Sequence, residues 1–491
     1  MAEQNIRVHF FSHRAALLGM LLMVAVVGLA SILWCVKNPA SGGFGQDGRF
    51  YGPVAQTLDA GSLDAYHFSR VLPSFAVHAG LVALRQPMDV AHIVVGFGVL
   101  DLLALLTACL LYALVAEELA MSLSAFWLGF LALFANFTML KFVWYTPVMT
   151  DAVAAALAMG MLLCYLKKRP VLLLLVTLLG AFTWPILIYA GCFLLVFPCK
   201  PVEEEKTAAP RWMAAGFALF VLAVTAYSFL WFRQTAYGTR MTPPVVQISV
   251  ALLLGLPVLY KAVEVLLDGI TLRSVWRAFA PYWALGAAAL WIAVKIPVWL
   301  WANPALYAVS ASTTIRKSSI LGFLYPLGFL ASHPTLLGPA VLLLYLFWRP
   351  YGRIVRRYGF GLVLVVWMGL LTALTPESRQ SLASYVMMTP FIGLLVEELA
   401  LPARFVGLLA LLALPMSRVW VNIIEKPESG TATALTAQNA LSHLDSLRNQ
   451  GPMMTPHTYL VKAAVVLGAM AVLWVALKWM RRREPGIGEP A

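Results

Sequence analysis

"AALLGMLLMVAVVGLASILWCV", residues 15–36, is the first of a series of apolar runs that decide the fold of this 491-residue chain. A helix of about 20 apolar residues crosses a hydrocarbon core about 30 Å thick, so this run is long enough to span a membrane. It is longer than the apolar core of a signal peptide, and Lys37-Asn38-Pro39 follows it where a small-residue cleavage site would stand. We therefore predict that the run is retained as the first transmembrane helix.

The composition places the whole chain in the same class. Hydrophobic residues make up 61% of the sequence and charged residues only 12%, and the mean hydropathy is +0.82. Similar runs recur from Arg14 to Met480, which predicts an all-α polytopic membrane protein of about 13 or 14 transmembrane helices. The run at 171–197 is too long for one helix and contains Pro185, so two short helices in a hairpin are expected there. The other expected spans are 15–36, 90–114, 123–141, 148–166, 212–232, 244–266, 280–302, 334–349, 359–375, 382–398, 403–422 and 459–479.

The basic residues, which give a formal net charge of +13, lie in short clusters between apolar runs. The positive-inside rule explains such clusters as cytoplasmic loops, so nucleic-acid binding is not expected. This threading puts both termini in the cytoplasm and leaves four longer segments outside, at 37–88, 233–243, 303–333 and 424–457. Within the third, Ile320–Ala331 is apolar but too short to span, and is expected to lie in the interface or to re-enter the membrane. The five cysteines lie in or beside apolar runs without CxxC spacing, so no disulfide or metal framework is predicted.

The first outer segment, 37–88, carries the densest polar motif. Its residues 43–60 read GFGQDGRFYGPVAQTLDA, with Asp47, Arg49 and Tyr51 close together among glycines. One interpretation is a solvated turn, which local chemistry alone favours because Gly and Asp are common in loops. The other is a carboxylate held by a glycine-shaped turn at the mouth of an intramembrane cavity, ready to take a proton from a hydroxyl nucleophile.

The same stretch resembles the first outer loop of bacterial membrane proteins in the GT-C glycosyltransferase superfamily. Members of that family often read Tyr-Asp-Gly-Gln-Phe-Tyr-Tyr, followed some 15 to 20 residues later by an Arg before Leu-Tyr-Pro. This chain has Gln46-Asp47-Gly48-Arg49-Phe50-Tyr51-Gly52 and then Arg70-Val71-Leu72-Pro73, which keep the acid, the first glycine, the Phe-Tyr pair, the arginine and the proline. It departs from the pattern at Gln46, Arg49 and Gly52 and lacks the Tyr before the proline, which leaves the sugar preference open.

The resemblance implies a GT-C-like fold with a helical first periplasmic loop. It further implies an inverting enzyme of the bacterial inner membrane that moves a sugar from a polyprenyl-phosphate donor to a glycan, lipid or protein acceptor at the periplasmic face. Asp47 would be the general base and Tyr51 a substrate contact. Arg70 and Arg49 would bind the phosphate, because the planar guanidinium binds phosphate with two donors. On this interpretation residues 1–424 form the catalytic module, and 425–491 add an outer loop and a last transmembrane helix in contact with membrane lipids.

Two further outer turns carry candidate residues. Asp151 begins an apolar helix; it or Thr150 would cap that helix, or Asp151 would contact sugar or metal, as an acid at this place does in similar proteins. The later turn, with Glu377 and Arg379 and with Tyr385 on the next helix, resembles the late Glu/Arg/Tyr turn of many relatives. A solvated turn explains Glu377 as well, whereas an outer arginine opposes the usual charge bias. We therefore expect substrate contacts from Asp151, Glu377 and Tyr385 and a phosphate contact from Arg379.

The remaining polar candidates have simpler alternatives. Arg316, with Lys317 beside it, is predicted to bind the donor phosphate, although lipid headgroups fit equally well. His67 near Arg70 is a predicted substrate contact or a satisfied surface histidine. Asp101 and Lys295 lie within apolar spans, where a charge must find protein or water; Lys295 is also able to snorkel to the interface.

Cofactor and function both leave alternatives. Asp47 and Asp151 are placed to share a divalent ion, Mg²⁺ or Mn²⁺, although no ligand cluster requires one. A transporter or lipid-carrier flippase would also have many spans and buried charges, but it predicts two related halves. The large polar outer loop has no counterpart in the second half, which favours the enzyme over the transporter. A polymerase or ligase would place its main outer loop later, and a non-catalytic scaffold stays open.

Overall fold

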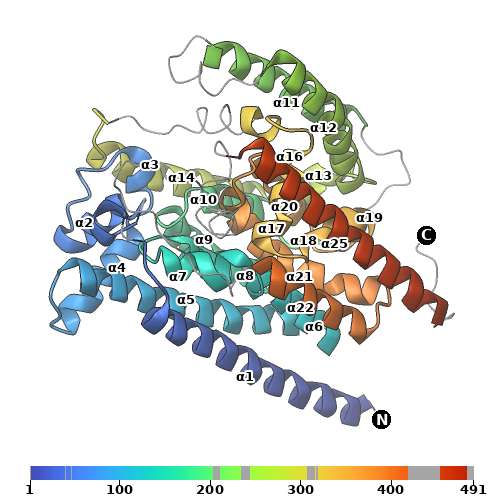
Figure 1. Cartoon of the computed structure of the whole chain (residues 1–491), viewed down its shortest axis with the longest axis horizontal. Coiled ribbons are helices and arrows are strands. Elements are labelled where there is room, and N and C mark those ends of the chain that lie inside the picture. The colour runs from blue at the N-terminus through green and yellow to red at the C-terminus, as the bar shows by residue number, and fades with distance from the viewer. Residues whose placement is uncertain are drawn as a thin grey trace.

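The structure is a computed structural model of the chain and describes residues 2–38, 40–45, 47–202, 211–233, 244–306, 316, 319–417 and 454–483. These residues form helices joined by short turns, and none of them lies in a β-strand. The expected all-α class is therefore confirmed (Figure 1). The predicted boundary at 424/425 lies outside the described residues.

Among the described residues, six helices are long and apolar enough to cross a membrane, which indicates a membrane-embedded, polytopic protein. They are α1 (Ala2–Trp34), α5 (Val90–Glu118), α11 (Arg211–Arg233), α12 (Val245–Leu266), α14 (Pro281–Trp301) and α25 (Pro456–Arg483). The pair α6 (Leu123–Phe134) and the following segment Thr138–Tyr145, bent by 54°, adds a seventh if it is one span. The expected count of 13 or 14 is larger because several predicted spans are helices of only 10–17 residues.

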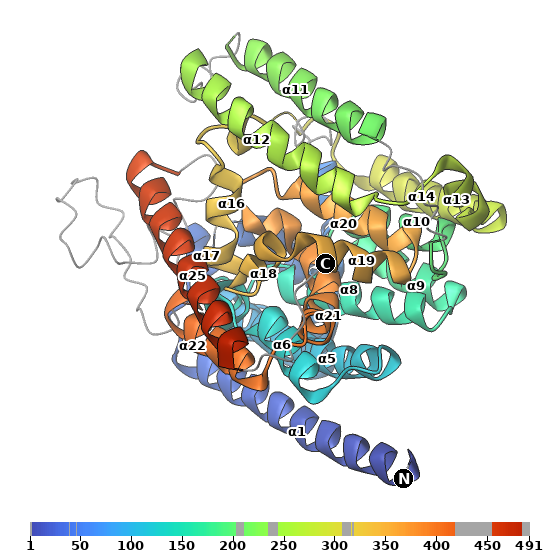
Figure 2. The same ribbon diagram turned by 90° about the vertical axis from the view of Figure 1, so that its right-hand side faces the viewer.

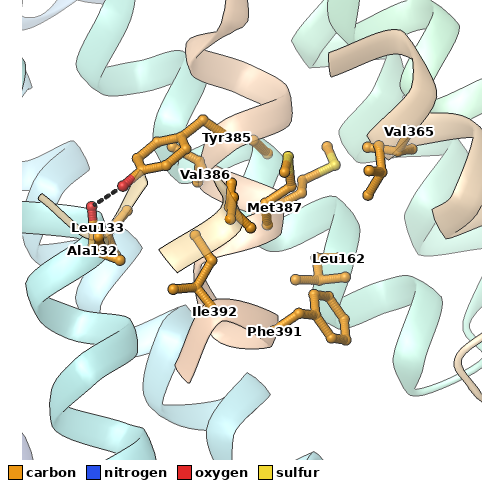
Figure 3. Packing of buried hydrophobic residues seen from close by; sticks show 14 of the residues in the cluster. Ala132, Leu133, Leu162, Val365, Tyr385, Val386, Met387, Phe391 and Ile392 are labelled. Atoms are coloured by element: carbon orange, nitrogen blue, oxygen red, sulfur yellow. Dashed lines mark hydrogen bonds between the residues drawn. The ribbon is translucent and has the colours of Figure 1, made fainter. Parts of the chain in front are cut away.

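The core is built where helices far apart in sequence pack on one another. α5 lies between α1 and α8 (Asp151–Leu166), and α6 packs on α21 (Leu382–Glu398). A Cβ added at Gly393 on α21 would lie 2.5 Å from the Ala125 carbonyl oxygen on α6, so only glycine permits this close crossing. Figure 3 shows side chains of α6, α8, α20 (Phe360–Thr372) and α21 meeting in this core.

The outer layers of the molecule expose apolar side chains. α11 and α12 form a hairpin along one edge, and α1 lies along the opposite edge (Figures 1 and 2). Leu18 and Leu22 on α1 are 68% and 65% exposed, and Leu253 on α12 is 74% exposed. Such surfaces are stable against hydrocarbon and costly in water, which agrees with lipid-facing helices.

Two predictions about broken helices have opposite outcomes. The hairpin at Pro185 is confirmed, with α9 (Pro170–Ala181) and α10 (Ile186–Val196) on either side. The single span predicted at 334–349 is wrong. Gly338, with φ of +88°, and Phe347 divide that region into α17 (Pro334–Leu337), α18 (Val341–Leu346) and α19 (Trp348–Arg357).

The apolar stretch Ile320–Ala331 is not one helix. It turns at Leu327, where φ is +52°, and α16 (Gly328–Ser332) follows. Phe323 and Phe329 are buried against the rest of the core. Its depth in the bilayer stays a prediction.

The first outer segment folds as a compact helical unit. It contains the 3₁₀ turn η1 (Ala40–Gly43) and the helices α2 (Gly48–Thr57), α3 (Ala65–Phe68) and α4 (Leu72–Ala83). In Figure 1 this unit lies at the end of the molecule opposite the start of α1 and the end of α25. Its helical content agrees with the expectation for this loop.

Candidate active site

The end of α1 fixes the start of the first outer unit. Lys37 Nζ donates to the carbonyl oxygens of Ser31 (2.8 Å) and Trp144 (3.1 Å), and the Asn38 backbone N–H donates to Tyr145 O (2.8 Å). The chain then turns through Gly45, whose φ of +81° favours glycine. These contacts bring the unit against the segment 144–151, which leads into α8.

Asp47 stands at the N-cap of α2, but its side chain makes no capping hydrogen bond. The side chain is 42% exposed, so solvent or a substrate can reach the carboxylate. α2 lies close against the segment that precedes α8, because a Cβ at Gly48 would already be 3.1 Å from Val148. The glycine-rich turn before α2 therefore presents an accessible acid, Asp47, beside the start of α8.

Asp151, the first residue of α8, is only 1% exposed. Thr150 holds the N-cap position without a side-chain capping bond, and the Asp151 hydrogen bonds go to Arg379 instead of the helix backbone. The capping interpretation of these two residues is therefore wrong.

Arg379 joins the two acids. It lies on the 3₁₀ turn η3 (Ser378–Ser381), 228 residues from Asp151 in sequence. Its Nε and Nη2 donate to Asp151 Oδ1 (3.0 Å) and Oδ2 (2.9 Å), a bidentate pair, and its Nη1 lies 3.6 Å from Asp47 Oδ2. Burial alone would lower the pKa of Arg379, but the charge and hydrogen bonds of Asp151 raise it above its ordinary value, so the guanidinium stays charged.

Arg70 is a second guanidinium close by, and it is 3% exposed. Its Cζ lies 4.1 Å from the ring centroids of both Tyr66 and Trp184, and its Nη2 donates to the Tyr66 hydroxyl. Among the described residues no carboxylate pairs with Arg70, and its Nε has no hydrogen-bond partner. A buried charge without a counterion is costly, so this arrangement favours binding of an anion.

Trp184 is a residue of the cluster for which the sequence analysis predicted no site role. It lies in the break between α9 and α10, 4.1 Å from Arg70 Cζ and 5.9 Å from Arg379 Cζ when measured from the ring centroid. The Leu72 N–H donates to Phe182 O (3.1 Å), which docks the start of α4 on the same break. An aromatic residue before a proline at a predicted outer helix end was the available signal.

No protein-family model, curated protein or solved structure matches this chain. The resemblance of its first loop to GT-C enzymes therefore stays a prediction.

Tyr51 and His67 form an aromatic wall beside this cluster. Tyr51 is 1% exposed, and its hydroxyl lies close to the Arg70 guanidinium; burial raises its pKa. His67 stacks on Phe50 with the ring centroids 3.6 Å apart, and its Nδ1 lies 2.7 Å from Asp64 Oδ2. Burial lowers the pKa of His67 by more than Asp64 raises it, so the net pKa is below its ordinary value. The ring is therefore neutral and donates to the Asp64 carboxylate.

Three other predicted residues make their contacts elsewhere. Arg49 is exposed, with its Cζ 4.7 Å from the Phe50 ring centroid, and the Arg316 Cζ lies 4.5 Å from the ring centroid of Trp231 on α11. The Tyr385 hydroxyl lies 3.0 Å from Ala132 O (Figure 3) and 2.9 Å from Leu337 O, which ties α21 to α6 and α17. These contacts do not involve Asp47 or Asp151, so the roles predicted for the three residues stay predictions.

The other charged candidates are Glu377, Asp101 and Lys295. Glu377 lies at the start of η3, where its charge acts on Arg379. Asp101 is 2% exposed, and its Oδ2 has no hydrogen-bond partner among the described residues. Lys295 is exposed on α14, with its Nζ 5.5 Å from the Trp291 ring centroid, as a snorkelling lysine would be.

A cavity of about 800 Å³ lies on another side of η3. Ser381 of η3 and Tyr385 and His333 line part of it, and the rest of its wall is mostly apolar side chains of α12, α16 to α21 and α25. His333 Nε2 donates to Ala373 O (2.7 Å) and its Nδ1 accepts from the Ser378 hydroxyl (3.0 Å). The turn that carries Arg379 is thus fixed between a polar cluster and an apolar cavity.

Proposed function

We propose that the protein is an inverting glycosyltransferase of GT-C type. It would take a sugar from a polyprenyl-phosphate donor at the periplasmic face of the bacterial inner membrane and pass it to a glycan, lipid or protein acceptor. One observation carries the proposal: three segments remote in sequence bring Asp47, Asp151 and Arg379 together, beside a buried Arg70 that no described carboxylate neutralises.

The chemistry divides between the two acids. Asp47 is the exposed one and lies 3.6 Å from its nearest cation, so it is the group able to exchange a proton. It removes the proton of the acceptor hydroxyl while that oxygen attacks the anomeric carbon. The bond between this carbon and the phosphate oxygen breaks on the opposite face, so the configuration inverts.

Arg70 supports the leaving group. As the bond to the sugar breaks, the lipid phosphate gains negative charge, and a preorganised guanidinium nearby stabilises that charge without reorganising. The apolar cavity beside η3 suits the long hydrocarbon chain that such a carrier bears. Both features suit a lipid-phosphate donor, and a solvated loop needs neither.

The test is a transfer assay with the full-length protein in proteoliposomes and polyprenyl-phosphate sugars as donors. Asp47→Asn keeps the shape of the side chain and removes the base, so we expect a loss of about 10²–10⁴-fold in rate. Asp59→Asn is the matched control, because Asp59 is exposed in the same outer segment and its oxygen accepts only a local N–H. An Asp47→Asn protein that transfers sugar at the unaltered rate would remove Asp47 from the mechanism.

A further inference from the structure

A divalent ion shared by Asp47 and Asp151 does not fit the geometry. Mg²⁺ and Mn²⁺ need several oxygen ligands, at about 2.0–2.1 Å for Mg²⁺. Both oxygens of Asp151 already accept from Arg379, at 3.0 and 2.9 Å, and the third nitrogen of the same guanidinium lies 3.6 Å from Asp47. Within the described part of the chain, no group of three or more His, Cys, Asp or Glu side chains is arranged to hold a metal.

We infer that Arg379 serves as a built-in cation in place of a metal ion, holding Asp151 rigidly and orienting Asp47. The guanidinium lies between the two carboxylates, where a shared ion would have to bind. It is suited to this position because its five N–H donors form a planar fork that addresses two carboxylates at once. The catalytic part of the inference, a transfer reaction independent of divalent metal, rests on the proposed function.

The surroundings of Arg379 support a fixed cation. Its side chain is 14% exposed, and its Cζ lies 4.9 Å from the Phe142 ring centroid, close enough for a cation–π contact. The neighbouring Ser378 is fixed by His333, which is itself bonded to Ala373 O. Arg379 is therefore fixed in two ways: the turn that carries it is anchored through Ser378, and its guanidinium is anchored by its charge.

The two acids consequently have different tasks. Asp151 makes two short charge-assisted hydrogen bonds and is buried, so it keeps Arg379 in place. Asp47 makes one longer contact and stays exposed, so it is oriented without being saturated. Arg379 and Asp151 are positioning residues, and Asp47 alone is left free to take a proton.

Mn²⁺ binding tests the inference without any turnover. Purified full-length protein is stripped with EDTA, reconstituted in nanodiscs and titrated with Mn²⁺ while free Mn²⁺ is followed by electron paramagnetic resonance. We expect the wild type to bind no Mn²⁺ beyond that bound by its Asp151→Asn variant. Wild-type binding that Asp47→Asn or Asp151→Asn abolishes would overturn the inference.

Arg379→Met is the decisive variant, because it keeps an unbranched, flexible side chain and removes the cation between the acids. We expect it to bind Mn²⁺ about tenfold or more tightly than the wild type, a difference of about 1.4 kcal/mol. The gain should disappear in the Arg379→Met/Asp151→Asn double variant. A folded Arg379→Met protein that gains no Mn²⁺ site would contradict the proposed place of the guanidinium, and the wild-type titration decides the question if this variant does not fold.

The transfer assay separates this inference from the proposed function. With active protein, EDTA should leave the rate unchanged. A rate that falls with EDTA and returns with Mn²⁺ would refute the built-in cation and leave Asp47 as the base. If no sugar is transferred at all, the Mn²⁺ titration still tests the role of Arg379.

Discussion

Replacing Arg70 with Met should separate the stability of the protein from its activity. Arg70 is a buried charge with no described carboxylate partner, and Arg379 repels it. Desolvating such a charge costs several kcal/mol. Its contacts with the rings of Tyr66 and Trp184 return about 0.5–2 kcal/mol each. Met has a similar length and no charge, so Arg70→Met should leave the free energy of unfolding within about 1 kcal/mol of the wild type or raise it.

The activity of the same variant should fall steeply. If Arg70 stabilises the leaving phosphate, its loss removes a preorganised donor, which costs about 10²–10³-fold in rate in comparable sites. Arg70→Lys keeps the charge but loses the fork, so an intermediate rate is expected. The assay measures transfer from a polyprenyl-phosphate sugar together with thermal unfolding of the same preparation.

The control for this pair of measurements is Arg85→Met, which removes an exposed arginine at the end of α4 and should change neither quantity. An Arg70→Met protein that loses more than about 2 kcal/mol of stability would show that the guanidinium is structural. A stable Arg70→Met protein with the wild-type rate would remove Arg70 from the phosphate site.

Three shorter predictions test the surroundings of the site. Asp151→Asn leaves a mostly buried Arg379 without its bidentate partner, so it should lower the free energy of unfolding by about 3–5 kcal/mol, measured by denaturation; an unchanged value would refute the pair. Gly52→Ala should destabilise the first outer unit, because its Cβ would lie 2.5 Å from the Phe44 ring, and unaltered resistance of this unit to proteolysis would argue against that packing. Burial lowers the pKa of His67 below its ordinary value of about 6.5, so as the pH falls the unfolded chain takes up the proton before the folded protein does. The stability contributed by the neutral ring is therefore complete above about pH 6.5 and declines below it. The difference in melting temperature between wild type and His67→Gln should therefore shrink as the pH falls from 7 to 5, and a constant difference would contradict this.

Much of the fold was predictable because a membrane allows only a few kinds of spanning structure, and the helix is the main one. Apolar runs locate helices, and Pro185 correctly places the break between α9 and α10. The single span predicted at 334–349 is wrong because hydropathy averages over a window and ignores single residues. Gly338-Pro339 and Pro350 were visible in the sequence and are the kind of residues that interrupt helices.

The charged members of the candidate cluster were predictable, whereas their pairings and the contacts of Trp184 were not. Asp47, in a glycine-rich loop, and Arg379, in a turn predicted to lie outside, both gave local signals. No local pattern connects Arg379 with Asp151, since 228 residues separate them and only tertiary packing brings them together. Tyr385 shows the opposite case. In the sequence, a hydroxyl near a polar turn resembles a substrate-binding residue, whereas in the structure it bonds to the carbonyl oxygens of Ala132 and Leu337.

The unequal contacts of the two acids follow from where charge must move in the proposed reaction. When Asp47 takes the acceptor proton it loses its negative charge, and the leaving phosphate gains one. The total negative charge beside the two arginines is therefore conserved, but one unit of it moves from Asp47, next to Arg379, to the phosphate next to Arg70. A cation bound as tightly to Asp47 as Arg379 is to Asp151 would oppose that shift, because it would hold the base in its ionised form. The 3.6 Å contact to Asp47 and the bidentate pair with Asp151 thus let Arg379 stay fixed while the base changes its charge.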